Sequence, residues 1–332
     1  MNYAARLFLG GPVSSEGLES ARESTLVSVK DPARAYTSFA WRLVLSAVIA
    51  TGGIAVSSSA VIIGAMLIAP LMSPMLGTTL AVALGDARAA VRTFFITLAG
   101  TAAGVLVAIA VAAIIPVGID TGANAEILSR VSPRLADLVI ALASGLMASI
   151  AVMRDDIPDA LPGVAIAAAI VPPLCVVGCS LYAGDMASAA GAALLFLANY
   201  FAIQISGFLF FLIIGIGSQR RSRYAREKKR ARALWLTAVV VGVVLVSVPL
   251  TLASLDIVQR NNDEIRARNV AAEWLEGSGY RIKSIDIDDG QIDMQIAGSG
   301  EEPSLEKLKS LLAAEDVPDV SLRVIRLEEK TL

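Results

Sequence analysis

A proline-broken apolar segment is the part of this sequence that best indicates a functional site. It begins at Gly64, contains Pro70, Ser73 and Pro74, and ends at Gly77. Each proline removes a backbone N–H donor, and its ring clashes with the carbonyl group one turn earlier in a helix. Carbonyl groups that lose their helical partner cannot face lipid, so they must line protein or a water-filled cavity. The carbonyl end of the first half-helix suits a cation, and the positive end of the half-helix that starts around Met75 suits an anionic or polar group.

A second segment repeats this pattern about 99 positions further along the chain. Gly163 and the pair Pro172-Pro173 correspond to the glycine and the prolines of the first segment, and each segment runs on to a Gly-Asp pair, Gly85-Asp86 in the first and Gly184-Asp185 in the second. Paired Pro- and Gly-interrupted segments in corresponding halves of a membrane chain point to a substrate site. The alternative for each segment is a simple proline kink that a neighbouring Ser or Thr repairs.

Two amide side chains also lie in apolar surroundings. Asn199 and Gln204 lie in the middle of the sixth apolar segment, where they either join helices by hydrogen bonds or line the pathway. The sequence contains no His, and its two cysteines, Cys175 and Cys179, both lie in an apolar segment. No nucleophile–base arrangement, nucleotide fingerprint or zinc motif is found. We therefore expect no enzymatic activity, no cofactor and no metal site.

The composition places these segments in a membrane. The chain is 55% hydrophobic with a mean hydropathy of +0.67, and several apolar runs exceed 18 residues. We expect an all-α polytopic membrane protein in which the second and fifth segments are broken. The seven predicted membrane segments are residues 39–56, 58–84, 90–115, 132–153, 158–183, 187–217 and 233–254.

Charge and segment count predict the orientation. The basic loop at 218–232 should be cytoplasmic, because cytoplasmic loops carry an excess of Lys and Arg. The N-terminus is then cytoplasmic too. Three segments hold each copy of the motif, and three is an odd number, so we expect a 3+3 inverted repeat. The predicted organisation is a cytoplasmic arm at 1–38, repeats at 39–115 and 116–217, the basic loop, a last membrane helix at 233–255 and an extracytoplasmic domain at 256–332.

The C-terminal domain has a different pattern. It predicts a helix through Val270 and Trp274, strands from Tyr280 to Asp288 and from Gln291 to Ile296, a second helix that starts at Pro303-Ser304, and a last strand from Val320 to Leu327. The order α-β-β-α-β indicates a small α+β soluble domain.

The run from Ser59 to Gly77, followed by Gly85-Asp86, resembles the signature of the bacterial and archaeal uncharacterised hydrophobic membrane proteins, the domain-of-unknown-function family numbered 389. The resemblance covers about residues 40–217, with a looser second copy at Gly163 and Pro172-Pro173. It implies a prokaryotic polytopic membrane protein, and it implies no particular activity.

The main functional hypothesis is an oligomeric transporter or channel for a small solute or ion in a prokaryotic cytoplasmic (inner) membrane. Its pathway would be formed by Gly64, Pro70, Ser73, Pro74, Gly77, Gly163, Pro172, Pro173, Asn199 and Gln204. The alternative is a non-transporting sensor or scaffold whose C-terminal domain binds a ligand or partner. The expected partners are the lipid bilayer and further copies of the chain. Nucleic acid is not expected, because Tyr224 is the single aromatic residue in the basic loop.

Overall fold

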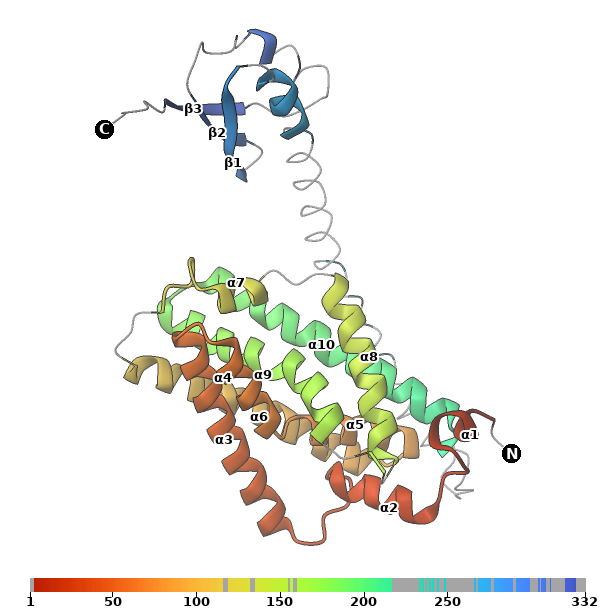
Figure 1. The fold of residues 1–332 in the computed structure, drawn as a ribbon. Coiled ribbons are helices and arrows are strands. Elements are labelled where there is room, and N and C mark those ends of the chain that lie inside the picture. The colour runs from red at the N-terminus through yellow and green to blue at the C-terminus, as the bar shows by residue number, and fades with distance from the viewer. Residues whose placement is uncertain are drawn as a thin grey trace. The chain divides into compact units, whose positions relative to one another are not determined.

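A computed structural model of the chain divides into two compact units, Met1–Thr251 and Leu252–Leu332, each with its own apolar core (Figure 1). The residues that the structure describes are 3–115, 119–131, 135–154, 156–157, 160–216, 233, 235, 237, 239, 241, 244, 248, 266, 268–275, 278–288, 291–298, 304, 306–308, 311 and 320–326. The predicted basic loop at 218–232 lies outside these residues, as does most of the predicted segment 233–254.

The described part of the first unit is helical. Its helices are α1 (Tyr3–Leu9), α2 (Ser15–Ser24), α3 (Pro32–Ala55), α4 (Ser59–Ile68), α5 (Met72–Leu84), α6 (Ala87–Ile114), α7 (Ala125–Val131), α8 (Leu135–Val152), α9 (Ala160–Ala183) and α10 (Met186–Ile213). Helix α3 begins seven residues before the predicted segment at 39. The side chain of Asp31 caps it by accepting a hydrogen bond from the Arg34 N–H, and Pro32 stands at its first position.

Three of the described helices, α3, α6 and α10, are each long and apolar enough to cross a membrane. Two further pairs would raise the number of candidate spans to five if each bent pair counts as one span. These are α4 with α5, which are bent by 48°, and α7 with α8, which are bent by 87°. The described residues therefore form a mostly helical protein with three to five candidate membrane spans.

One predicted feature is wrong. The fifth predicted segment, 158–183, was expected to be broken at Pro172 and Pro173, but α9 continues through both prolines as one helix. A helix survives an internal proline where a neighbouring helix supplies a partner for the freed carbonyl group, and α10 supplies that partner here.

The two Gly-Asp pairs adopt the same local structure. Gly85 and Gly184 both have positive φ, 72° and 78°, a conformation that suits glycine. The Asp that follows each glycine caps a helix of 28 residues: Asp86 accepts from the Ala89 N–H at 3.1 Å, and Asp185 accepts from the Ser188 N–H at 3.0 Å. The repeated sequence thus encodes a repeated structure, in which α6 and α10 begin about 99 positions apart.

The two turns lie at opposite ends of the helical unit. At the end that we call the α2 end, Arg92 in α6 donates to the Leu26 and Val27 carbonyls, which follow α2. At the other end, the α7 end, the turn at Asp185 precedes a close approach between Gly191 of α10 and the Val131 carbonyl of α7. Figure 1 shows α2 and α7 on opposite sides of this unit. Helix α6 therefore starts at the α2 end, and α10 starts at the α7 end.

The second unit contains a small three-stranded sheet. Its sheet has the order β1-β2-β3, formed by β1 (Tyr280–Asp288), β2 (Gln291–Gly298) and β3 (Val320–Arg326). Strands β1 and β2 are antiparallel, whereas β2 and β3 are parallel. Trp274 is buried against the sheet and donates from Nε1 to the Ser304 carbonyl at 2.8 Å. These strands lie where the sequence predicts them.

Candidate substrate pathway

The first proline segment breaks its helix as predicted. Helix α4 ends at Ile68 and α5 begins at Met72, three residues earlier than the predicted start at Met75. Pro70 lies in the gap between the two helices. Pro74 lies in the first turn of α5, where its missing N–H would have no helical partner in any case. The N-terminus of α5 has no side-chain cap.

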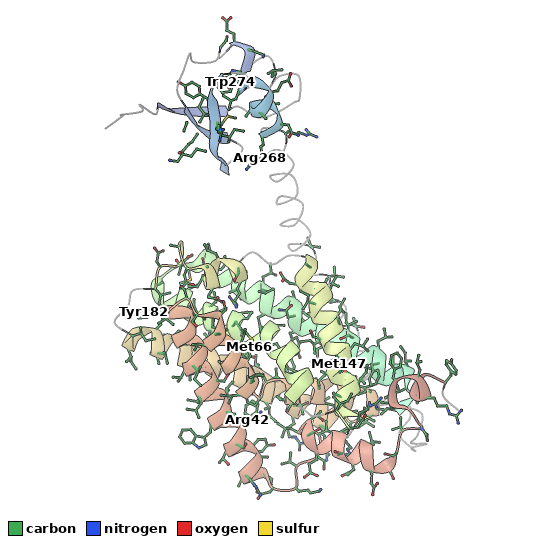
Figure 2. All side chains as sticks on the ribbon, viewed as in Figure 1. Arg42, Met66, Met147, Tyr182, Arg268 and Trp274 are labelled. Atoms are coloured by element: carbon green, nitrogen blue, oxygen red, sulfur yellow. The ribbon has the colours of Figure 1, made fainter. Side chains whose placement is uncertain are left out.

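Protein donors already occupy carbonyl groups at the end of α4. Arg42 of α3 donates from Nε to the Ile68 carbonyl at 3.1 Å, and Ser46 donates from Oγ to the Ala65 carbonyl at 2.8 Å. Figure 2 labels Arg42 on α3 and Met66 on the neighbouring α4. Of the two possibilities that the sequence leaves open, a cation at the carbonyl end is thus disfavoured, because an arginine takes that place.

A cavity of about 300 Å³, the first cavity, lies at this break. Ser24 and Thr25 of the α2 segment line it, so it lies toward the α2 end. Arg42, Pro70 and Ser73 bring the polar groups of α3 and the break to its wall. The remaining lining residues are Met66, Leu67, Ala69, Met72 and Val152.

Asn199 explains why the second proline segment stays helical. Pro173 cannot donate to the carbonyl of Ala169, one turn earlier. Asn199 of α10 donates from Nδ2 to that carbonyl at 2.7 Å. A side chain from the neighbouring helix therefore replaces the lost bond. Gly163 lies in the first turn of α9, and its surroundings lie outside the described residues.

A second cavity, of about 240 Å³, lies beside Pro173. It lies toward the α7 end, because α7 contributes Ser129 and Arg130. Arg130 forms an ion pair of 2.7 Å with Glu126, and Ser59 at the start of α4 donates to the same carboxylate. The other lining residues are Asp137, Ile140, Ala169, Leu195 and Asn199.

Gln204 joins two helices. Its Nε2 donates to the Met75 carbonyl at 3.0 Å, and its Oε1 accepts from Thr79 Oγ1 at 2.5 Å. The side chain is fully buried and lines neither of the two cavities. Gln204 is therefore an interhelical link between α10 and α5. Asn199 serves both purposes that the sequence allows, since it links α10 to α9 and also lines the second cavity.

The two predicted glycines of the first segment have different surroundings. A Cβ atom added at Gly77 would lie 2.1 Å from the Thr25 carbonyl oxygen, so Gly77 allows the end of α2 to pack on α5. A Cβ atom added at Gly64 would meet nothing within 4 Å. Gly77 thus shapes the α2 end next to the first cavity, whereas Gly64 has no such role in this structure.

An apolar layer forms the core of the unit that contains the two cavities. Leu71, which precedes α5, is buried in one cluster with Met75 of α5, Leu174 of α9 and Ile203 of α10. The cluster contains residues that adjoin both proline segments. Both proline segments therefore share one packed apolar core.

Sequence reasoning did not select Arg42, Arg130 or Glu126. Arg42 could have been found, because a charged residue inside a predicted membrane segment marks a functional position. The pairing of Glu126 with Arg130 could have been found from their spacing of four residues in a helix. Among the described residues no group of three or more His, Cys, Asp or Glu side chains is placed to hold a metal ion.

Comparisons with known proteins find a family model and a relative that each match part of the chain. The family model described as "Domain of unknown function (DUF389)" matches residues 66–205. This range includes Pro70 of the first cavity, Pro173 and Asn199 of the second, and Gln204. An uncharacterized protein of Methanocaldococcus jannaschii is 32% identical over 126 residues. The matched residues make up 37% of this chain and 39% of that relative, so the chain matches well under half of the relative's length. No solved structure matches the chain.

Proposed function

We propose that the part of the chain matched by the DUF389 family model forms a pathway by which a small solute or ion crosses a prokaryotic cytoplasmic membrane. The pathway would run from the first cavity to the second along the two proline segments. In this proposal the chain is not an enzyme and needs no cofactor.

The proposal includes a 3+3 inverted repeat within a protein of about seven membrane segments. In the first repeat α3 packs on α4 and α6, and in the second α8 packs on α9 and α10. The Gly-Asp turns before α6 and α10 share one local structure and lie at opposite ends of the unit. Inverted repeats of this kind place equivalent gates on the two sides of a membrane.

The observation that carries the proposal is the position of the two cavities. Each lies at one proline segment, and they lie toward opposite ends, the first beside Thr25 and the second beside Arg130. Sites formed at interrupted helices are typical of transporters, and the first cavity lies at such an interruption, between α4 and α5. In this proposal the packed apolar core that adjoins both proline segments closes the pathway, and opening must rearrange it.

Flux into liposomes tests this function. The purified full-length protein is reconstituted, and uptake is measured for a panel of inorganic ions, small organic acids, amino acids and polyols. We expect flux of at least one class above that of empty liposomes. A Ser73→Trp variant, which fills the first cavity, should lose that flux, whereas Ile63→Trp, on the exposed face of α4, should keep it. The absence of flux for the whole panel would contradict the proposal.

For the orientation we propose a cytoplasmic N-terminus and an extracytoplasmic C-terminal unit, supported by the basic composition of residues 218–232. Further copies of the chain and the lipid bilayer remain the proposed partners.

The second candidate function is a sensor or scaffold. The observation that favours it is the independent core of the C-terminal unit, built around Trp274, Met294 and Ile296. Deletion of residues 261–332 separates the two functions. A truncated protein that stays folded and keeps its flux would contradict the sensor as the main function.

A further inference from the structure

We propose that the first cavity binds a soluble oxyanion, a carboxylate or a phosphate, through the guanidinium group of Arg42. The inference deepens the proposed function, because it names the substrate class of one end of the pathway. It can nevertheless be tested by binding alone, without any flux.

Arg42 makes a hydrogen bond through Nε that leaves the two terminal amino groups of its guanidinium group available. Its Nε–H is used on the Ile68 carbonyl at 3.1 Å, which fixes the plane of the guanidinium group next to the helix break. The two terminal amino groups then remain as a fork, and such a fork matches two oxygens of a carboxylate or phosphate.

Two further donors stand on the same wall. Met72 is the first residue of α5, where backbone N–H groups have no partner inside the helix and the helix dipole is positive. The Ser73 hydroxyl makes no hydrogen bond to any residue in the described part of the chain, and both residues line the cavity. The break in α4–α5 thus brings two donors from α5 to the same cavity as the arginine of α3.

The charge of the cavity indicates an anion rather than a cation. Arg42 is the one charged residue in the described lining, and it makes no ion pair within the described ranges. The second cavity is a useful contrast. There Arg130 is neutralised by Glu126 at 2.7 Å, and Asp137 adds a carboxylate to the wall. Only the first of the two cavities therefore presents a positive charge that no described acidic side chain balances.

The size of the cavity agrees with a small solute. Pockets that hold small molecules have volumes of roughly 300–1,000 Å³, and the first cavity, at about 300 Å³, lies at the lower end of that range. It is therefore large enough for a small organic acid or for phosphate with some water.

Binding to the full-length protein in detergent tests the site. Sodium phosphate and sodium acetate are titrated at constant ionic strength, with sodium chloride as the reference salt, and the affinity is measured by calorimetry and by the shift in Tm. We expect at least one of the two oxyanions to bind the native protein and to raise its Tm. Arg42→Gln should weaken that binding tenfold or more, whereas Arg88→Gln, an exposed arginine on α6 outside both cavities, should leave it unchanged.

An Arg42→Lys variant covers the case in which Arg42→Gln does not fold. Lysine keeps the charge but has no fork, so we expect folded protein with clearly weaker binding than the native protein. Equal binding by the native protein and by a folded Arg42 variant would overturn the proposal. Stabilisation by phosphatidylglycerol alone, with no response to phosphate or acetate, would also overturn it, because the positive group would then be a lipid contact. Binding without flux would instead contradict the proposed function and leave the site in place.

Discussion

Replacement of Gly77 by alanine is expected to destabilise the protein, whereas the same replacement at Gly64 is not. The two glycines belong to the same sequence motif and both lie in apolar helices. They differ in what a methyl group would meet. At Gly77 the added Cβ would lie 2.1 Å from the Thr25 carbonyl oxygen and 3.1 Å from Thr93 Cγ2, and at Gly64 it would meet nothing within 4 Å.

The size of the destabilisation by Gly77→Ala depends on which atom the new methyl group contacts. Thr25 is buried, and its N–H and its hydroxyl both donate to the Ala21 carbonyl, so its backbone is held by α2. The clash therefore cannot be relieved by rotating a side chain. Overpacking costs about 1–3 kcal/mol, and the upper value of about 3 kcal/mol applies to a backbone contact of this kind. Alanine regains about 1 kcal/mol of helix propensity, which leaves a net loss of about 2 kcal/mol.

The assay is thermal unfolding of the two variants in the same detergent. A loss of about 2 kcal/mol corresponds to a fall in Tm of roughly 4–8 °C for a unit of this size. Gly64→Ala should melt at the native temperature or slightly above it. If Gly77→Ala melts no lower than Gly64→Ala, then the end of α2 does not pack on α5, and the description of the α2 end is wrong.

Three further predictions concern single side chains. The hydroxyl and N–H of Ser188 hold the pKa of Asp185 below its usual value. The ionised carboxylate therefore stabilises the fold above the unfolded pKa of about 3.9, and this stability is lost as the pH falls through the lower folded value. As the pH falls below about 4, the Tm of the native protein should therefore fall more than the Tm of Asp185→Asn. Asn199→Leu should lower the stability of the fold by about 1–3 kcal/mol in the same assay, because it leaves the Ala169 carbonyl without a donor. An unchanged Tm would show that water donates to this carbonyl instead. Glu126→Ala should lower Tm more than Glu126→Ala combined with Arg130→Met, because the single variant leaves a mostly buried guanidinium unpaired.

The repeated Gly-Asp pairs show what local sequence can predict. A glycine followed by a capping Asp determines its turn through backbone conformation and one hydrogen bond, and both copies at Asp86 and Asp185 have the same structure. The break at Pro70 was predictable for the same reason. In both cases the cause lies within a few residues of its effect.

The continuous α9 shows what local sequence cannot predict. Whether Pro173 breaks its helix depends on Asn199, a residue 30 positions away from the carbonyl that it caps. The same holds for Arg42 at the end of α4, where the arginine precedes its carbonyl partner by 26 positions. Such contacts depend on how helices pack, and one sequence shows only that a polar residue lies in an apolar segment.

The difference between Asn199 and Gln204 has the same origin. Both are amides in α10, five residues apart, and composition alone treats them alike. The structure separates them because Asn199 lines the second cavity, whereas Gln204 reaches the Met75 carbonyl and Thr79 in α5. Whether each amide lines a cavity or links two helices depends on where the neighbouring helices lie.

A pathway between two cavities at opposite ends predicts that a thiol reagent can block flux from each side of a liposome membrane at a different position. Cys175 and Cys179 are buried and are first replaced by alanine. Ser73→Cys then places a thiol in the first cavity, and Ala169→Cys places one in the second. With the protein inserted in one orientation, a membrane-impermeant thiol reagent should stop flux through Ser73→Cys only from the α2 side and flux through Ala169→Cys only from the α7 side. Block of both variants from the same side, or flux that neither modification reduces, would contradict a pathway between the two cavities.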